Sequence, residues 1–180
     1  MELKIRKNGE VYIADTGNNV IRKIDQNGKV TTYAGSKEGC ADGSLAQARF
    51  SEPTGLYYYR GALYVADSGN HRICQIKDGV VTTIAGSKAG KEGDSTKKAL
   101  CASLSNPQDI FVNSSGIYIS DTGNACIKKL SGGKLSLAVE AFSLGDGRAP
   151  AEPGALLVRG STLLFGDTFT EELYSLDLSE

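Results

Sequence analysis

The chain has 180 residues, of which 40% are hydrophobic and 23% are charged, a balance typical of a globular domain with its own core. Its formal net charge of −1 gives no global field that would attract nucleic acid or an anionic membrane. No apolar run approaches the roughly 20 residues of a membrane span. The first residues also lack the apolar stretch of a secretory signal, so we expect no membrane contact and, by default, a cytoplasmic location.

Short segments with strand character follow one another along the chain in groups of four. They lie at 2–7, 10–15, 20–25 and 29–35, then at 54–60, 62–67, 72–77 and 80–86, and again at 108–113, 116–121, 126–131 and 134–139. A fourth group supplies three more, at 154–159, 162–167 and 172–177. Because tight-turn pairs such as Asp78-Gly79 separate them, successive strands are expected to be antiparallel.

A recurring motif, Asp-Thr/Ser-Gly-Asn, follows the second segment of the first three groups. Its aspartates, together with a weaker match at Asp167, recur about every 50 residues, the period of propeller blades. Pro53, Pro107 and Pro153 each precede the next of these aspartates by the same interval. The chain therefore divides into units 1–52, 53–106, 107–152 and 153–180. The expected fold is an all-β propeller of four-stranded antiparallel blades, with three blades and most of a fourth.

The motif residues have a mechanical interpretation. An Asp before a tight turn can accept a backbone N–H two residues on, and a Gly supplies positive φ. Three copies of the same Asp argue against a catalytic role for any one of them. We therefore assign structural turn roles to Asp15, Asn18, Asp67, Asn70, Asp121 and Asn124.

The full pattern of the second unit runs from Pro53-x-Gly55 through Leu-Tyr-Val-Ala-Asp-Ser-Gly-Asn-His-Arg-Ile to Gly-x-Val-x-Thr-x-Ala-Gly. This pattern resembles the NHL repeat, and the first three units carry it more clearly than the fourth. The resemblance implies a β-propeller, most often with six blades. On that basis the four units would form an open arc, completed by further blades or by a second copy.

His71 is the only histidine of the chain and lies inside the motif of the second unit. It aligns with Asn19 and Ala125, so we interpret it as a variable turn residue. A Ser-His-Asp triad with Ser68 and Asp67 lacks a nucleophile elbow. One histidine also cannot build the multi-histidine zinc site that a resemblance to amidating lyases would imply. We expect no catalytic residues, no metal ligands and no cofactor.

Other chemistry-bearing residues point to structure more than to a site. Four separate cysteines, Cys40, Cys74, Cys101 and Cys126, form no C-x-x-C pair and are expected to be reduced. Asp109 and Asn113 on an inner strand are the only hints of an axial calcium ion, as the resemblance to six-bladed lactonases would suggest.

Nucleic-acid binding is not favoured by the basic and aromatic residues. Basic pairs at 22–23, 97–98 and 128–129 are balanced by acids over the chain, and the Tyr57–Tyr59 run is expected to pack between blades.

The long connections between units are expected to share one rim with the motif turns, because both follow the second or fourth strand of a meander. They span 36–53 and 87–107, and each is predicted to hold a short helical turn, capped by Asp42 or Thr96. Ala48 and Phe50, or Ala102 and Leu104, would then pack on the blades. Partner-binding rim residues are predicted at Asn19, His71, Arg72 and Lys91.

These features predict a non-catalytic propeller that acts as a protein-interaction or scaffold module through this rim. The alternative is part of a six-bladed enzyme or metal-binding propeller, lactonase-like or lyase-like, whose site lies in blades outside this chain.

Overall fold

The computed structural model describes residues 4–7, 9–86, 98–139 and 151–178, and it is built from four antiparallel sheets. The first blade contains β1 (Lys4–Lys7), β2 (Glu10–Asp15), β3 (Val20–Ile24) and β4 (Val30–Ala34). The second contains β6 (Pro53–Tyr59), β7 (Ala62–Asp67), β8 (Arg72–Lys77) and β9 (Val80–Ala85), with β5 (Gly43–Ser44) on its outer edge. The third contains β10 (Asp109–Asn113), β11 (Gly116–Asp121), β12 (Cys126–Ser131) and β13 (Lys134–Val139). The fourth contains β14 (Pro153–Arg159), β15 (Thr162–Asp167) and β16 (Glu172–Asp177).

Local turn chemistry explains this meander. Arg60-Gly61 and Asp78-Gly79 have positive φ at both residues, which is the type I′ geometry that matches the twist of paired strands. Consecutive strands therefore pair directly, β6 with β7 and β8 with β9. The predicted all-β fold with four-stranded antiparallel blades is confirmed.

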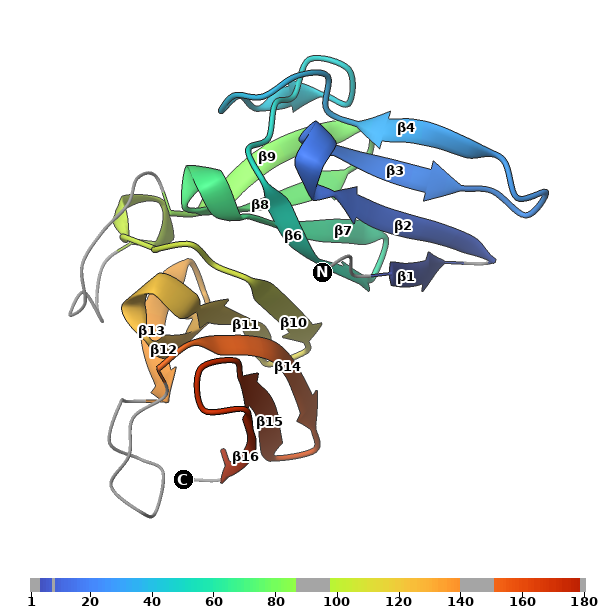
Figure 1. The fold of residues 1–180 in the computed structure, drawn as a ribbon. Helices are drawn as coiled ribbons and strands as arrows, with labels where there is room; N and C mark the ends of the chain where they lie inside the picture. Colours follow the sequence, from blue (N-terminus) through green and yellow to red (C-terminus); the bar gives the residue numbers. More distant parts are fainter. Residues whose placement is uncertain (1–3, 8, 87–97, 140–150, 179–180) are drawn as a thin grey trace.

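The blades follow one another in an arc, with the first blade at one end and the fourth at the other (Figure 1). Apolar residues fill the spaces between neighbours. Leu56 and Leu63 of the second blade pack with Tyr12 and Ile21 of the first. On the other side of the second blade, Tyr57 packs on Phe111 of the third in a tilted arrangement, with 4.7 Å between ring centroids. Inner blades thus carry apolar residues on both faces.

Four single helical turns complete the described part, and they are too short to span a lipid bilayer. Three of them, η1 (Thr16–Asn18), η2 (Ser68–Asn70) and η4 (Thr122–Asn124), are the motif turns. The fourth, η3 (Ala99–Cys101), lies in the second interblade connection, where a helical turn was predicted.

The first connection corrects the prediction of a helical turn capped by Asp42. Here the chain forms the short strand β5 and a hydrogen-bonded turn, and the Asp42 carboxylate binds Arg72 and Thr83. Thr96 lies outside the described residues. Ala48, Phe50, Ala102 and Leu104 are all buried, as the sequence predicted.

The four cysteines are free thiols. Cys74 and Cys126 are buried, and burial raises the pKa of the Cys74 thiol. Cys40 and Cys101 are exposed in the interblade connections.

Candidate functional site

The motif turns and the interblade connections lie at the same end of the blades, as expected. Gly69 in the second motif donates its N–H to the carbonyl of Ser51, and Gly123 in the third donates to that of Ser105. These two motif turns are therefore bonded to the connection that precedes their blade. We call the end of the blades where these turns and connections meet the rim.

The backbone of the motif differs from the prediction in one respect. Positive φ belongs to the residue after the asparagine, at 58° for Asn19, 54° for His71 and 52° for Ala125, and not to the motif glycine. Gly69 is needed for a different reason, because a Cβ there would lie 2.6 Å from Oγ of Ser51. The glycine thus permits close approach of the connection rather than an unusual turn.

The motif aspartates join the turn to the connection before it. Asp67 accepts the N–H of Ser51 at 2.8 Å, and Asp121 accepts the N–H of Ser105 at 2.6 Å. Their other oxygen binds the motif asparagine, Asn70 or Asn124. The predicted bond to the N–H two residues on is wrong for these two, because that N–H is the one that binds the connection.

Each of these aspartates also faces a cation from the third strand of its blade. Arg72 donates Nε to Asp67 at 2.7 Å, Arg22 donates to Asp15 at 2.8 Å, and Lys128 pairs with Asp121. Arg22 holds the pKa of Asp15 below its usual value. Burial raises the pKa of Asp67, and the charge of Arg72 opposes that rise.

The fourth blade has no such cation facing its aspartate in the described structure, and backbone donors take its place. Asp167 accepts the N–H groups of Ala151, Glu152, Phe169 and Thr170. Burial works against the charged form, but these four donors outweigh it and lower the pKa of Asp167.

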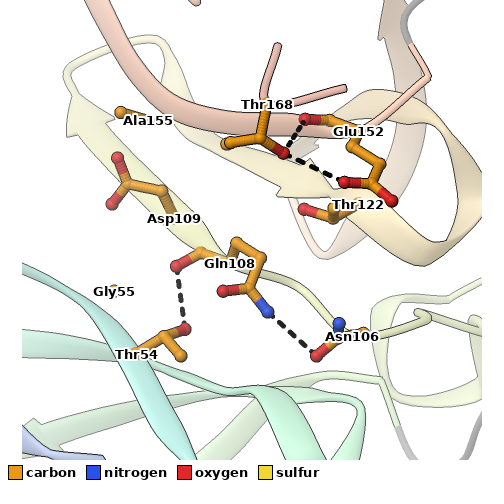
Figure 2. A pocket seen from close by; sticks show the side chains of 10 residues that line it. Thr54, Gly55, Asn106, Gln108, Asp109, Thr122, Glu152, Ala155 and Thr168 are labelled. Atoms are coloured by element: carbon orange, nitrogen blue, oxygen red, sulfur yellow. Dashed lines mark hydrogen bonds between the residues drawn. The ribbon is translucent and has the colours of Figure 1, made fainter. Parts of the chain in front are cut away.

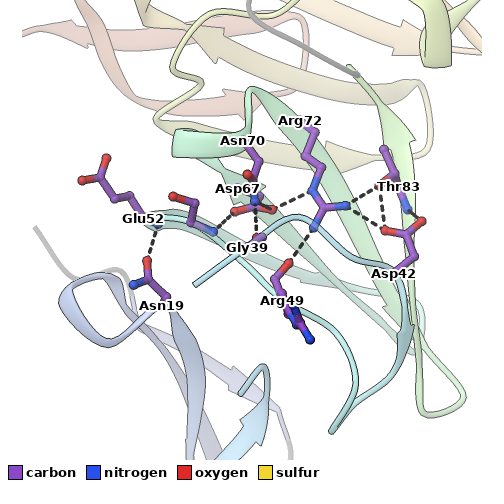
Figure 3. Close-up of polar contacts among 10 residues, drawn as sticks. Asn19, Gly39, Asp42, Arg49, Glu52, Asp67, Asn70, Arg72 and Thr83 are labelled. Carbon is purple, nitrogen blue, oxygen red and sulfur yellow. Dashed lines mark hydrogen bonds and ion pairs between the residues drawn. The ribbon is translucent and has the colours of Figure 1, made fainter. Parts of the chain in front are cut away.

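Arg72 corrects the list of predicted rim residues. It is 3% exposed, and its guanidinium binds Asp67, Asp42, Thr83 and the carbonyl of Arg49 (Figure 3). These bonds hold the first connection against the second blade, so the side chain is not available to a partner. Lys91 lies outside the described residues.

His71 and Asn19 are partly exposed and bind the connection that follows their blade. Nδ1 of His71 accepts the N–H of Asn106 at 3.0 Å, and Oδ1 of Asn19 accepts the N–H of Glu52 at 2.8 Å (Figure 3 shows the second bond). Glu52 and Asn106 both precede a proline and both have φ of 48°. The two side chains therefore play the same part in successive blades.

The hydroxyl after each motif aspartate also reaches the next blade. Thr16, Ser68 and Thr122 donate to the carbonyls of Pro53, Pro107 and Pro153. We call the motif aspartate, this hydroxyl and the left-handed residue, with their bonds to both neighbouring connections, the interblade clasp. The repeated hydroxyl is visible in the sequence, but its bond is not, because the carbonyl that accepts it belongs to the start of the next blade.

A cavity of about 330 Å³ opens at the rim between the second, third and fourth blades (Figure 2). Its lining comes from the starts of inner strands and from motif turns: Thr54, Gly55, Asn106, Gln108, Asp109, Thr122, Glu152, Gly154, Ala155 and Thr168. Of these, the sequence singled out Asp109 alone. The others are ordinary strand-start residues that only the arc brings together.

Asp109 is buried in the wall of this cavity. Burial raises its pKa to about 6, although the N–H groups of Leu156 and Ile110 each donate to one of its oxygens. Asn113 lies at the opposite end of β10, so the two residues considered for calcium do not come together. Within the described ranges, no group of three His, Cys, Asp or Glu side chains is placed to hold a metal.

Members of two of the basic pairs are engaged within the fold, whereas Lys98 of the pair at 97–98 is exposed. Lys23 binds Glu10 at 2.9 Å, Arg22 binds Asp15, and Lys128 is 3% exposed.

Comparison with known proteins gives the family. Residues 50–76 match the family model of the NHL repeat. The chain is 30% identical over 176 residues to NHL repeat-containing protein 2 of Gallus gallus, a match that covers 95% of this chain and 23% of that protein. It is 32% identical over 133 residues to Protein SUPPRESSOR OF QUENCHING 1, chloroplastic, of Arabidopsis thaliana, covering 66% of this chain and 12% of that protein. The chain thus spans less than a quarter of the length of these curated relatives.

Solved structures share the fold at low sequence identity. An auxiliary nutrient binding protein from Bacteroides thetaiotaomicron aligns with a TM-score of 0.69 and 15% identity, over 93% of this chain and 45% of that one. A catalytically inactive virginiamycin B lyase from Staphylococcus aureus aligns with a TM-score of 0.63 and 17% identity, over 99% of this chain and 55% of that one. With three blades that carry the motif, a fourth that matches it more weakly, and these sequence matches, the chain belongs to the NHL-repeat family.

Proposed function

We propose that this chain is a non-catalytic interaction module that binds a protein partner through the rim. The observation that carries the proposal is that different sets of residues form the clasps and line the cavity at this end of the blades. Most repeated side chains are engaged in the interblade clasps, whereas residues that change from blade to blade, among them Gln108 and Glu152, line the cavity next to the clasp hydroxyl of Thr122. A rigid scaffold with variable residues in its loops is the common arrangement of binding surfaces.

The chemistry of the cavity suits a polypeptide ligand. Gly55, Gly154 and Ala155 supply small and apolar surface, while Thr54, Gln108 and Glu152 supply donors and acceptors around it (Figure 2). Gln108 already bonds Asn106, and Thr54 bonds the carbonyl of Gln108, so the lining is fixed before a ligand arrives. Preorganised polar groups of this kind lower the cost of binding.

A capture experiment with matched variants tests the proposal. Gln108→Arg combined with Glu152→Arg places bulk and charge at the cavity, and Lys77→Glu changes an exposed charge at the far end of β8. A partner retained by the wild-type chain and by Lys77→Glu, but lost with the double variant, is the expected result. A partner lost only with Lys77→Glu, or the absence of any partner sensitive to the cavity, would contradict it.

The second candidate is an enzyme or metal-binding propeller to which this chain contributes some blades. Its support is Asp109, a buried carboxyl with a raised pKa in a cavity wall. The lyases among the structural neighbours add only a shared fold. Calcium titration followed by amide chemical shifts distinguishes the two candidates, because an axial ion would shift the amides of Ile110 and Leu156, which bond Asp109.

A further inference from the structure

The rim cavity, the space of about 330 Å³ that opens among the second, third and fourth blades, takes most of its lining from one place in the repeat. This place is the pair of residues that follows Pro53, Pro107 and Pro153. The pairs are Thr54 and Gly55, Gln108 and Asp109, and Gly154 and Ala155. Three successive blades of the described chain therefore enclose the cavity together.

Asp109 is the exception among these pairs. Its counterparts in the blades on either side are Gly55 and Ala155, so this position of the repeat takes a small residue in both neighbours. The small neighbour also makes room for the carboxyl, because a Cβ on Gly55 would lie 3.0 Å from Oδ1 of Asp109. The carboxyl is thus a feature of the third blade and not of the repeat.

The charge of Asp109 is not balanced by a cation within the described structure. The buried motif aspartates Asp67 and Asp121 each have one, whereas Asp109, which is 8% exposed, accepts only the N–H groups of Ile110 and Leu156. A carboxylate has about four acceptor positions, so each oxygen can accept again. Burial outweighs the two donors and raises the pKa of Asp109 to about 6. A cation in the cavity would offset this cost.

The other polar groups of the lining are mostly acceptors as well. Three threonine hydroxyls already donate their proton to a backbone carbonyl oxygen, so toward a ligand they can only accept. They are Thr54, which donates to Gln108, Thr122, which donates to Pro153, and Thr168, which donates to Glu152.

Charge and amides complete this picture (Figure 2). Glu152 adds a second carboxylate, and none of the ten lining residues is Lys, Arg or His. The side-chain amides of Gln108 and Asn106 are the remaining donors, and the first already donates to the second. The lining is therefore complementary to a cationic group with several N–H donors, an ammonium or a guanidinium.

We propose that the rim cavity binds the side chain of a lysine or arginine of the partner polypeptide, with its positive charge facing Asp109 and Glu152. The inference rests on the proposed function, which brings a polypeptide to the rim, and it names the residue that the cavity selects. The alkyl stem would lie against the small residues Gly154 and Ala155. The threonine hydroxyls would accept the remaining N–H groups of the cation.

The test titrates short capped peptides into the full chain at about pH 7, where the Asp109 carboxyl is mostly ionised, with EDTA to remove metal ions. The probes are acetyl-Gly-Ser-Lys-Ser-Gly-amide, its arginine counterpart, and the same peptide with norleucine, which keeps the stem without the charge. Saturable shifts of the Ile110 and Leu156 amides, which bond Asp109, report binding. Half-saturation at or below about 5 mM is expected for lysine or arginine, and at least fivefold weaker binding for norleucine.

Matched variants separate the cavity from the overall charge. Asp109→Asn should weaken binding of the lysine peptide at least fivefold, and Glu152→Gln at least twofold. Asp78→Asn makes the same change in net charge at an exposed turn at the other end of the second blade, and it should leave binding unchanged. Glu152 is exposed, so Glu152→Gln keeps the test valid if Asp109→Asn disturbs the fold.

The outcomes distinguish this inference from the proposed function. Equal binding of the norleucine and lysine peptides would overturn the inference alone, because the cavity would then take a polypeptide without regard to charge. Unchanged affinity in Asp109→Asn would do the same. Butylammonium that binds as tightly as the lysine peptide would assign the site to a free amine and overturn it. No saturable shift with either basic peptide also overturns it, while the capture experiment with Gln108→Arg and Glu152→Arg decides the proposed function separately.

Discussion

The residue after the motif asparagine carries two tasks that few side chains combine. It must adopt a left-handed backbone, which asparagine and histidine tolerate better than most residues. It must also present an acceptor to the N–H before the next proline, as Asn19 and His71 do. For His71 this requires an unprotonated Nδ1, with the ring proton on Nε2. Ala125 shows that the third blade does without this acceptor.

The effect of a substitution at His71 on stability should depend on whether the new side chain keeps this acceptor. His71→Asn keeps an acceptor and a tolerant backbone, so we expect a change within about 0.5 kcal/mol. His71→Ala removes both and should cost about 1–2 kcal/mol. Asp67→Ala should cost more, about 3–5 kcal/mol, because it removes the buried partner of Arg72, which keeps only the more exposed Asp42, and leaves the N–H of Ser51 without its acceptor. Urea midpoints at constant m-value give this order, and a larger loss for His71→Ala than for Asp67→Ala would contradict it.

Asp109 should make stability depend on pH. Its pKa rises from the ordinary value of 3.8 to about 6 in the fold, so the folded chain binds this proton more tightly than the unfolded chain does. The stabilisation is present at low pH and is lost as pH rises from about 4 through about 6, by roughly 3 kcal/mol in total. The unfolding free energy of the wild type minus that of Asp109→Asn, measured at several pH values, should show this fall, because the lowered pKa values of Asp15 and Asp167 act in the opposite direction in both chains. Asp109→Asn removes this contribution to the pH dependence of stability. Identical profiles of unfolding free energy against pH for the two chains would therefore contradict the assignment.

Some residue roles could be predicted from the sequence and others could not. The recurrence of Asp15, Asp67 and Asp121 indicated a structural part, since a repeated residue serves the repeat. The burial of Arg72 could not be predicted, because the cation that faces the aspartate comes from different positions of the third strand in different blades. Arg72 follows Asp67 by five residues, while Arg22 and Lys128 follow their aspartates by seven.

At the level of elements, the need for glycine in a motif turn depends on how closely the preceding connection approaches that turn. A Cβ on Gly69 or Gly123 would lie 2.9 or 2.8 Å from the backbone carbonyl oxygen of Ser51 or Ser105. A Cβ on Gly17 would meet nothing within 4 Å. The same glycine therefore has a steric role in two turns and open space in the third.

This contrast gives a prediction with an internal control. Gly69→Ala should lower stability by about 1–3 kcal/mol, because the connection must shift and its bond to the turn lengthens. Gly17→Ala should change stability by less than about 0.5 kcal/mol. Thermal or urea unfolding of the two variants measures both, and equal losses would show that the glycine serves turn conformation instead of close approach.

Strands were predictable because their signals are local. Alternating apolar residues and pairs such as Asp78-Gly79 lie within a few residues of the strand they bound. The first connection was predicted as a helical turn and forms β5 instead, since its conformation is set by the edge of β9, which is distant in sequence. The same limit applies to the rim cavity, whose lining comes from strand starts about 50 residues apart.

On the scale of the whole molecule, the arc is held by nearest-neighbour contacts. Each blade packs an apolar face on the next, and each clasp adds bonds from one turn to the connections on both sides. Stability of such arrays is approximately a sum of unit and interface terms. A change in one clasp should therefore affect its own two interfaces first.

Amide hydrogen exchange on the wild type and on Asp67→Ala tests the clasp most directly. The N–H of Ser51 donates to Asp67, and that of Ser105 donates to Asp121. In the wild type both amides should exchange more slowly than is usual for residues in loops that connect strands. In Asp67→Ala, which removes the acceptor, the Ser51 amide should exchange at least tenfold faster, while the Ser105 amide keeps its protection. Fast exchange of Ser51 in the wild type, or no selective change in the variant, would contradict the conclusion that the repeated aspartates hold neighbouring blades together.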